Sequence, residues 1–245
     1  MSLNCVCLLT IKPSEIWLKF LSKFTNYKVI IVCDDNSVNY SEILDYPNLQ
    51  FVQIPNSECL KFGFANLSSA ISPKQIVNSW DKAMYYFSKI NLTFNNVWLI
   101  EDDVYFYSEK TLLDIDIQYT NNDLLSNTIT SKSDDMKSPW QWHWCLFSIN
   151  LPEPHFRAMA CAIRISKKLF SCIAAYADNN GTLFFLEPLF PTLAYHNTLI
   201  HTVIEELLHI EYRHEWLLED IDTRSLYHPI KNLYQHIDNR EIERF

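Results

Sequence analysis

Residues 97–106, VWLIEDDVYF, join a short apolar run to a cluster of three carboxylates. The first four of these residues are apolar, which is typical of a strand buried on both faces of a parallel sheet. Glu101, Asp102 and Asp103 follow directly, so the strand is expected to end in them. Side chains alternate along a strand, which predicts Glu101 and Asp103 on one face and Asp102 on the other. Three carboxylates so placed repel one another unless a cation lies between them.

A second acidic cluster follows an earlier predicted strand, because the apolar run KVIIVC at residues 28–33 stops at Asp34 and Asp35. The other elements expected in this part of the chain are strands at 6–11 and 50–54, a helix at 13–24, and a helix through SWDKAMYYFSKI that starts in a capping box at Ser72, Pro73 and Gln75. This order predicts an α/β fold with a mostly parallel central sheet flanked by helices. Ligands of such sheets bind beyond the carboxyl ends of the strands, so both acidic clusters are expected on one rim.

The rest of the chain is less regular. Residues 108–138 are polar and predict an extended loop with some helix near 110–117. Strands are expected at 140–147, 156–165 and 209–216, and helices after Ser166 and at 183–196 and 232–245. No Pro/Gly/Ser-rich linker divides the chain, which favours a single domain.

The composition excludes several classes of protein. Two glycines in 245 residues leave no Rossmann fingerprint or P-loop. A net charge of -9, without a Lys/Arg cluster, argues against a nucleic-acid partner. No apolar run reaches the length of about 18 residues that a membrane span needs, and the N-terminus does not resemble a signal peptide.

The seven cysteines form no metal-type CxxC pair, and we expect them to be reduced in a cytoplasmic protein. Many asparagines and few glycines are typical of an AT-biased genome, such as that of a large virus or a parasite. For a viral protein the compartment would be the host cytoplasm.

The acidic clusters predict a site for a hard divalent cation. Mn²⁺ or Mg²⁺ takes one or two protein carboxylates and completes its shell with water and phosphate oxygens. Such a cation would neutralise a diphosphate and stabilise it as a leaving group. The alternative is a solvated acidic turn, because acidic residues commonly end strands.

In their order and spacing, VIIVCDDNS, SWDKAMYYF and VWLIEDDVYF resemble the GT-A class of nucleotide-sugar glycosyltransferases over residues 4–107. The signature of that class is a D-x-D or E-D-D triplet leaving a central strand, and the E-D-D form is similar to that of N-acetylglucosaminyltransferases that use UDP-GlcNAc. The resemblance implies a single GT-A-like domain over 1–245, with 1–107 binding the nucleotide sugar and 108–245 the acceptor. It implies a metal-dependent hexosyl- or N-acetylhexosaminyltransferase that moves a sugar from a UDP-sugar to a glycan or other hydroxyl acceptor.

The resemblance also implies roles for the acidic residues. Asp103 would bind the metal directly, and Asp102 would contact the metal or the ribose. Glu101 would lie near the ribose or base, and Asp34 or Asp35 would meet the nucleoside.

Basic residues and a late histidine complete the implied donor site. His228 and Lys231, in SLYHPIK, match by position a histidine that GT-A enzymes often supply to the metal and a basic residue near the diphosphate. A surface turn around Pro229 is the alternative for both. Lys82, on the helix before the triplet, could reach the donor or simply be solvated. Arg164 is a weaker candidate for binding an anion.

Glu187 is the candidate general base, because it lies inside the apolar run LFFLEPLFPTLAY. Burial there is costly unless the carboxylate is paired or lies in a cleft, and it would raise the pKa. A raised pKa suits a base that takes the acceptor proton in a direct, inverting displacement. The alternative is a glutamate at a helix N-terminus beside Pro188. Asp134 and Asp135 are reserve candidates, and a retaining enzyme would have the same donor half.

Trp140, Trp142 and Trp144 alternate, so on a strand they share one face, where an indole could stack on an acceptor sugar or pack in the core. Three other functions remain open. A sugar-phosphate nucleotidyltransferase would usually need a glycine-rich loop, which this chain lacks. A glycan-binding protein without activity could share the scaffold, and an acidic metal-dependent phosphohydrolase would hydrolyse simple phosphate esters.

Overall fold

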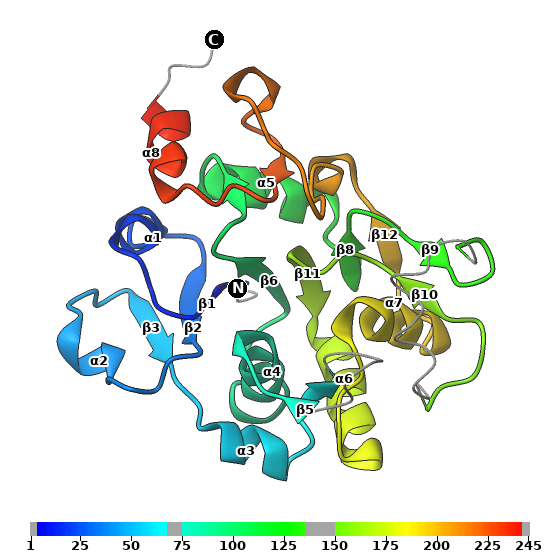
Figure 1. Ribbon diagram of the computed structural model, residues 1–245. Coiled ribbons are helices and arrows are strands. Elements are labelled where there is room, and N and C mark those ends of the chain that lie inside the picture. Colours follow the sequence, from blue (N-terminus) through cyan, green and yellow to red (C-terminus); the bar gives the residue numbers. More distant parts are fainter. Residues whose placement is uncertain (1–3, 68–74, 136–149, 242–245) are drawn as a thin grey trace.

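Seven strands form the central sheet of the computed structural model, which describes residues 4–67, 75–135 and 150–241. Their spatial order is β12-β8-β11-β6-β1-β2-β3 (Figure 1). The strands span β1 (Cys5–Thr10), β2 (Lys28–Cys33), β3 (Leu49–Val52), β6 (Asn96–Glu101), β8 (Leu124–Ser126), β11 (Ala162–Ser166) and β12 (His201–Val203).

Most neighbours in this sheet are parallel, which confirms the predicted α/β class. Strands β3, β2, β1 and β6 run in one direction, and β12 is parallel to β8. Strand β11 is antiparallel to both of its neighbours, β6 and β8. All six residues of β1 are buried, as expected for a strand covered on both faces.

Helices cover both faces of the sheet, and side-chain alternation divides the core into two layers. Cys5, Cys7 and Leu99 face the layer that contains α4 (Ser79–Tyr85), the π-helix η1 (Tyr86–Ile90), α6 (Lys167–Asn180) and α7 (Leu186–His196). Val6 and Trp98 face the opposite layer, with α1 (Glu15–Leu21) and α5 (Glu109–Gln118). Helix α8 (Leu233–Glu241) lies beside α1 (Figure 1).

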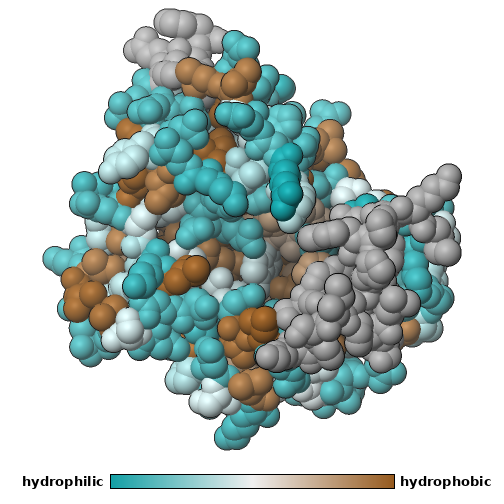
Figure 2. Space-filling view, viewed as in Figure 1, coloured by the Kyte–Doolittle hydropathy of each residue, from teal (hydrophilic) through white to brown (hydrophobic). Residues whose placement is uncertain are grey.

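Short elements fill the periphery. They are α2 (Tyr40–Ile43), α3 (Asn56–Lys61), β7 (Tyr105–Phe106), β13 (Leu226–Tyr227), η3 (Glu205–Leu207) and η4 (Leu218–Asp220). None of the helices in the described residues is long and apolar enough to cross a membrane. Hydrophilic residues cover much of the face seen in Figure 2, and its apolar patches are separate from one another.

The predicted start of α4 is wrong. The helix begins at Ser79, and its capping box is formed by Asn78 and Asp81. Asn78 Oδ1 accepts a hydrogen bond from Trp80 N at 2.9 Å, and the Asp81 carboxylate accepts one from Asn78 N at 2.9 Å. Gln75, placed in the predicted cap, belongs to β5 (Gln75–Ile76), which pairs with β4 (Asn66–Leu67). Asparagine caps a helix as well as serine does, so the helix starts at the later of the two possible caps, Asn78.

The prediction for 108–138 is confirmed in its helix near 110–117, which is α5, and wrong in the extended loop expected around it. The described part of this segment contains α5, the sheet strand β8, and β9 (Thr130–Ser131), which pairs with β10 (Phe156–Arg157). The strand expected at 156–165 is divided into β10 and β11. The segment 209–216 forms no strand, and Ile210 makes only an isolated bridge to His228. The helix after Ser166 is confirmed, because the Ser166 hydroxyl caps α6 at Leu169 N.

A buried ion pair joins α5 to β11. Arg164, considered as an anion-binding residue, is fully buried, and its Nη1 lies 2.8 Å from Asp116 Oδ1. Trp98 Nε1 and the Tyr27 hydroxyl also donate to the Asp116 carboxylate, at 3.2 and 2.7 Å. The Arg164 Nη2 group donates to two carbonyl oxygens at 2.6 and 2.9 Å. Arg164 therefore has a structural role in the core.

We expect Asp116→Ala to lower the free energy of unfolding by about 3–5 kcal/mol, because it leaves the Arg164 guanidinium buried without its counter-charge. Asp114→Ala, on the exposed face of the same helix, should change it by about 0.5 kcal/mol or less. Equilibrium urea denaturation measures both. Equal effects of the two substitutions would contradict the structural role of the pair.

Candidate metal and nucleotide site

The acidic triplet lies where the central strand ends. Glu101 is the last residue of β6, and a turn closed by the hydrogen bond from Val104 N to Glu101 O, at 3.1 Å, carries Asp102 and Asp103. In the parallel part of the sheet Leu9 is in register with Glu101, and Thr10 with Cys33. Glu101 and the Asp34–Asp35 pair that follows β2 therefore lie on the same rim.

Asp102 connects the end of β6 to the end of β1. Its Oδ2 accepts a short hydrogen bond from the Thr10 hydroxyl, and its carbonyl oxygen accepts one from Trp17 Nε1 at 2.8 Å. Burial raises the pKa of the Asp102 carboxyl, although the Thr10 hydrogen bond acts to lower it. These contacts fix the turn that carries the triplet.

Asp103 contacts a histidine from the C-terminal part of the chain. His228 Nε2 lies 3.3 Å from Asp103 Oδ1, and Ile230 N donates to Asp103 O at 2.7 Å. Burial alone would raise the pKa of Asp103, but the hydrogen bond and charge of His228, with the charge of Lys231, lower it below its usual value. Burial would likewise lower the pKa of His228, but Asp103 raises it. The pair therefore favours its ionised form.

The other ring nitrogen of His228 is held by the main chain. Nδ1 lies 2.5 Å from the carbonyl oxygen of Glu211, so Nδ1 carries the proton in a neutral ring and Nε2 presents its lone pair to the triplet. A second main-chain contact joins Trp216 Nε1 to the His228 carbonyl at 3.0 Å. This is the arrangement that orients histidine ligands in metal sites.

Glu101 points toward the same place. Its Oε1 accepts a hydrogen bond from Trp80 Nε1 at 2.6 Å, and its Oε2 lies 4.0 Å from His228 Nε2. Burial raises the pKa of Glu101, the Trp80 hydrogen bond lowers it, and the charge of Asp103 raises it. One ligand atom each of Glu101, Cys161 and His228 lie within 4.8 Å of one another.

Glu187 lies in the first turn of α7, and its backbone carbonyl accepts a hydrogen bond from Ala158 N at 3.0 Å. Burial raises its pKa to about 7. The charge of Arg157 acts to lower that pKa, and the charge of Glu101 acts to raise it. The charge of His228 also acts to lower the Glu187 pKa, so Glu187 and the triplet influence one another electrostatically. Of the reserve candidates, Asp135 binds Arg157 Nε at 2.6 Å and Asp134 accepts from Ser131 Oγ at 2.7 Å.

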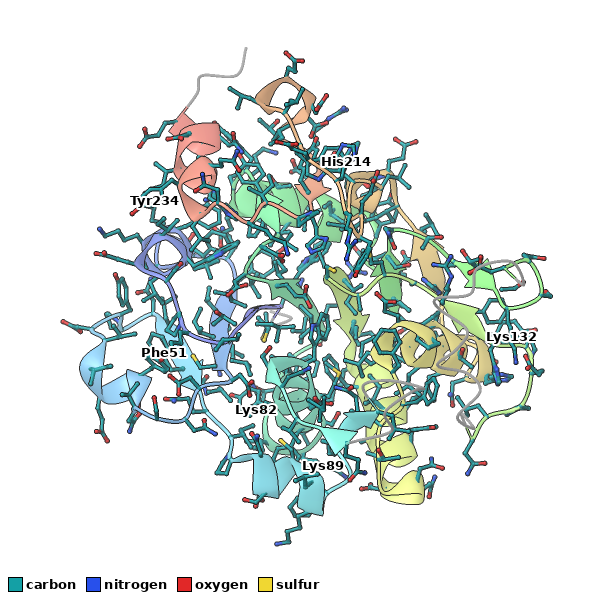
Figure 3. All side chains as sticks on the ribbon, in the orientation of Figure 1. Phe51, Lys82, Lys89, Lys132, His214 and Tyr234 are labelled. Atoms are coloured by element: carbon teal, nitrogen blue, oxygen red, sulfur yellow. The ribbon has the colours of Figure 1, made fainter. Side chains whose placement is uncertain are left out.

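The residues after β2 are held in two different ways. Lys82, on α4 (Figure 3), is fully buried, and its Nζ lies 2.7 Å from both the carboxylate and the carbonyl oxygen of Asp34. Asp35 accepts hydrogen bonds from Ser37 N at 2.8 Å and from the Tyr40 hydroxyl at 3.1 Å. The bonds from Ser37 lower the pKa of Asp35 to about 2.

Lys231 is exposed, three residues after His228, and it lines a pocket of about 620 Å³ together with residues 212–216. In the view of Figure 3, the pocket segment that carries His214 lies on one side of β6, and α4, which carries Lys82, lies on the other. Trp140, Trp142 and Trp144 lie outside the described residues.

Sequence reasoning missed four residues that contact the triplet, namely Thr10, Trp17, Trp80 and Cys161. It also missed Trp216, which holds the His228 carbonyl, and Arg157, which pairs with Asp135. A buried tryptophan usually needs a partner for its indole N–H, and this was the available signal for Trp17 and Trp80. Cys161 and Arg157 gave no such signal.

No protein-family model matches the sequence, and no curated protein matches it either. Among solved structures, galactosyltransferase LgtC in complex with donor and acceptor sugar analogs aligns over 97% of this chain and 95% of its own, at 10% identity and a TM-score of 0.50. The chain has a GT-A-type fold. Weaker matches include mouse xyloside xylosyltransferase 1, at 12% identity over 83% of this chain and 85% of that chain with a TM-score of 0.40. Another is 4-diphosphocytidyl-2C-methyl-D-erythritol synthase from Anaerococcus prevotii, at 10% identity over 83% and 86% with a TM-score of 0.45.

The likeness to solved structures shows the GT-A-type fold that carries this rim. The roles of the rim residues are predictions. The central sheet, the triplet at the end of β6 and the carboxylates after β2 occur in the order expected from the sequence.

The electrostatic environment of Glu187 can be tested without any substrate. We expect its carboxyl group to titrate near pH 7, against 4.5 for an ordinary glutamate, because it is buried. Arg157→Met should raise the midpoint further, because it removes the positive charge that acts to lower it. Infrared difference spectra against Glu187→Gln report this carboxyl group.

Lys132→Met is the matched control, because Lys132 pairs with Glu153 and should leave the midpoint unchanged. A midpoint near 4.5 in the native protein would show that Glu187 is solvated.

Proposed function

We propose that this protein is a metal-dependent glycosyltransferase that moves a hexosyl or N-acetylhexosaminyl group from a UDP-sugar to a hydroxyl of a glycan or other acceptor. The observation that carries the proposal is the contact of Asp103 with His228 at the end of β6, on the rim that also holds Asp34 and Asp35. It joins an acidic triplet to a distant histidine in one place. A solvated acidic turn would need no such partner.

The residues present fit a divalent cation. Asp103 Oδ1 and His228 Nε2 would bind it, because the two atoms lie 3.3 Å apart and Nδ1 of the histidine is already occupied. Carboxylate oxygen and imidazole nitrogen suit Mn²⁺, and Mg²⁺ is the oxygen-preferring alternative. Asp102 would contribute a second carboxylate or contact the ribose. A bound cation would supply neutralisation of the diphosphate leaving group.

The remaining donor contacts come from both sides of the triplet. Lys231, whose charge already reaches Asp103, would bind the diphosphate from the C-terminal segment. Glu101 and the Asp34–Asp35 pair would hold the nucleoside. Lys82 would act on the donor through Asp34, since its ammonium group is buried against that residue.

Glu187 would be the general base. A carboxylate with a pKa of about 7 has a higher proton affinity than an ordinary glutamate and still ionises near neutral pH. It would accept the proton of the acceptor hydroxyl while the oxygen attacks the anomeric carbon. The sugar would be transferred in one displacement with inversion of configuration.

The chain would work as one domain over 1–245, with residues 1–107 holding the donor and 108–245 the acceptor. The cysteines of the described residues are free, and the four at Cys5, Cys7, Cys33 and Cys59 are buried at 0% exposure. Free, buried thiols of this kind suit a reducing compartment such as the cytoplasm.

We expect the purified protein to release UDP from one member of a panel of UDP-sugars when Mn²⁺ is present, and to stop when the metal is chelated. Asp103→Ala should reduce this rate by about 10³-fold, since it removes a metal ligand that helps to stabilise the leaving group by several kcal/mol. Asp178→Asn, which changes a half-exposed carboxylate paired with Lys89, is the matched control.

Wild-type turnover by Asp103→Ala would remove Asp103 from the metal site. Metal-independent binding of glycan without UDP release would favour a glycan-binding protein, and release of pyrophosphate from a nucleoside triphosphate would favour a nucleotidyltransferase.

The pH dependence of transfer should show the ionisation of Glu187. A base must be deprotonated, so kcat/KM should be level above about pH 7 and fall tenfold per pH unit below it. Glu187→Gln should lower kcat by about 10²–10⁴-fold and abolish this limb, while Glu153→Gln, an exposed carboxylate paired with Lys132, should leave both unchanged. NMR of the product should show inversion at the anomeric carbon, and retention would rule out Glu187 as the base in a direct displacement.

A further inference from the structure

A cysteine thiol lies next to the triplet and has no part in the proposed transfer. The backbone carbonyl of Cys161 accepts a hydrogen bond from Glu101 N at 2.9 Å, directly before β11 begins. The residue as a whole is only partly buried, unlike the cysteines of β1 and β2. Its sulfur, a carboxylate oxygen of Glu101 and a ring nitrogen of His228 lie within 4.8 Å of one another.

The two partners of Cys161 in this group are already oriented by other residues. Glu101 Oε1 is held by Trp80 Nε1 at 2.6 Å, and His228 Nδ1 is held by the Glu211 carbonyl at 2.5 Å. Each therefore has one atom, Oε2 or Nε2, that its outer partner does not hold, although Nε2 also lies 3.3 Å from Asp103 Oδ1. Outer partners of this kind fix the ligands of metal sites and increase their affinity.

The three donors differ in chemistry from the oxygen-rich set proposed for Mn²⁺ or Mg²⁺. A thiolate, an imidazole and a carboxylate suit Zn²⁺ or Cd²⁺, whereas hard cations avoid sulfur. Neighbouring ligand atoms of a tetrahedral zinc site lie about 3.4–3.6 Å apart, so each pair of donors needs to approach by about 1.4 Å at most. Rotation about the Cα–Cβ bond of Cys161 can move its sulfur and supply much of this movement, while the hydrogen bond from Glu101 N keeps its backbone in place.

We propose that Glu101, Cys161 and His228 form a binding site for a thiophilic divalent cation, Zn²⁺ or Cd²⁺, that shares His228 with the proposed Mn²⁺ site and excludes Mn²⁺ when filled. On binding, the S–H bond of Cys161 breaks, its proton passes to solvent, and the sulfur electron pair forms the bond to the cation. No oxidation or reduction takes place. The exclusion of Mn²⁺, and hence inhibition by zinc, rests on the proposed function, but the site itself does not.

The test is a titration with Cd²⁺, followed by the ultraviolet absorption that a thiolate–cadmium bond produces. It is made in a Cys145→Ser/Cys172→Ser background, which removes Cys145 and the other partly exposed thiol of the described residues, Cys172. We expect one equivalent of cadmium to give this absorption. Cys161→Ser and Cys161→Ala should both abolish it, and should weaken Zn²⁺ binding in calorimetry by at least the ~10–100-fold typical of lost outer-shell partners.

Competition gives a second measurement. Zn²⁺ should release bound Mn²⁺, which is seen as recovery of the electron paramagnetic resonance signal of free Mn²⁺. In Cys161→Ser the same release should need a Zn²⁺ concentration at least about tenfold higher. Far-ultraviolet circular dichroism checks that the variants are folded.

Absorption that persists in folded Cys161→Ser, or that is missing from the native background, would overturn the site. Simultaneous binding of Zn²⁺ and Mn²⁺ would overturn the exclusion. If cadmium binds through Cys161 but the protein transfers no sugar, this site is upheld and the transferase proposal is rejected. If the protein transfers sugar but shows no cadmium–thiolate absorption, the transferase proposal is upheld and this site is rejected.

Discussion

The candidate site depends on one contact, between a carboxylate at the end of the central strand and a histidine far along the chain. His228 reaches Asp103 because main-chain hydrogen bonds hold both sides of the segment that carries it. Strand β13 pairs with β7 just beyond the triplet, His228 N donates to the His209 carbonyl at 3.0 Å, and Ile230 N donates to the Asp103 carbonyl at 2.7 Å. These bonds fix the backbone, so the contact between the imidazole and the carboxylate costs little further conformational entropy. The rest of the site is arranged around this point.

The electrostatics of the triplet follow from that contact. Three neighbouring carboxylates cannot all be ionised cheaply at a buried rim. The structure separates them: burial raises the pKa of Glu101 and Asp102, whereas His228 and Lys231 outweigh burial and lower that of Asp103. Asp103 is therefore the member of the triplet that most favours its ionised form, and it lies beside His228, whose pKa it raises. A cation bound here would compete with the His228 proton for the same lone pair, so metal binding and protonation would be linked at this histidine.

The parts of the fold and site that could be predicted are those set by local pattern and strand direction. Strands at 28–33 and 97–100 read as apolar runs, and parallel strands end on the same side, so the two acidic clusters could be placed together. The partners of those clusters could not, because they depend on register between distant segments. Trp80 meets Glu101 only because α4 begins at Ser79, after its cap Asn78. Lys82 is buried against Asp34, although its sequence context fits an exposed lysine equally well. Helix near 110–117 could be predicted, but strand β8 could not, because the polar segment around it lacks clear periodicity. Its order depends on tertiary contacts such as the Asp116–Arg164 pair.

One antiparallel strand explains how the second half of the chain reaches the rim. In a wholly parallel sheet, the strand beside β6 would begin at the opposite edge and send its first residues away from the triplet. Strand β11 runs against β6, so its amino end lies beside the carboxyl end of β6, with Ala162 in register with Ile100. The residues before β11 therefore reach the triplet: Cys161 accepts from Glu101 N, and Ala158 pairs with the backbone of Glu187 in the first turn of α7. The reversal brings the carboxylate proposed to act on the acceptor within electrostatic reach of the carboxylates proposed to hold the donor, although the two groups lie far apart in the sequence.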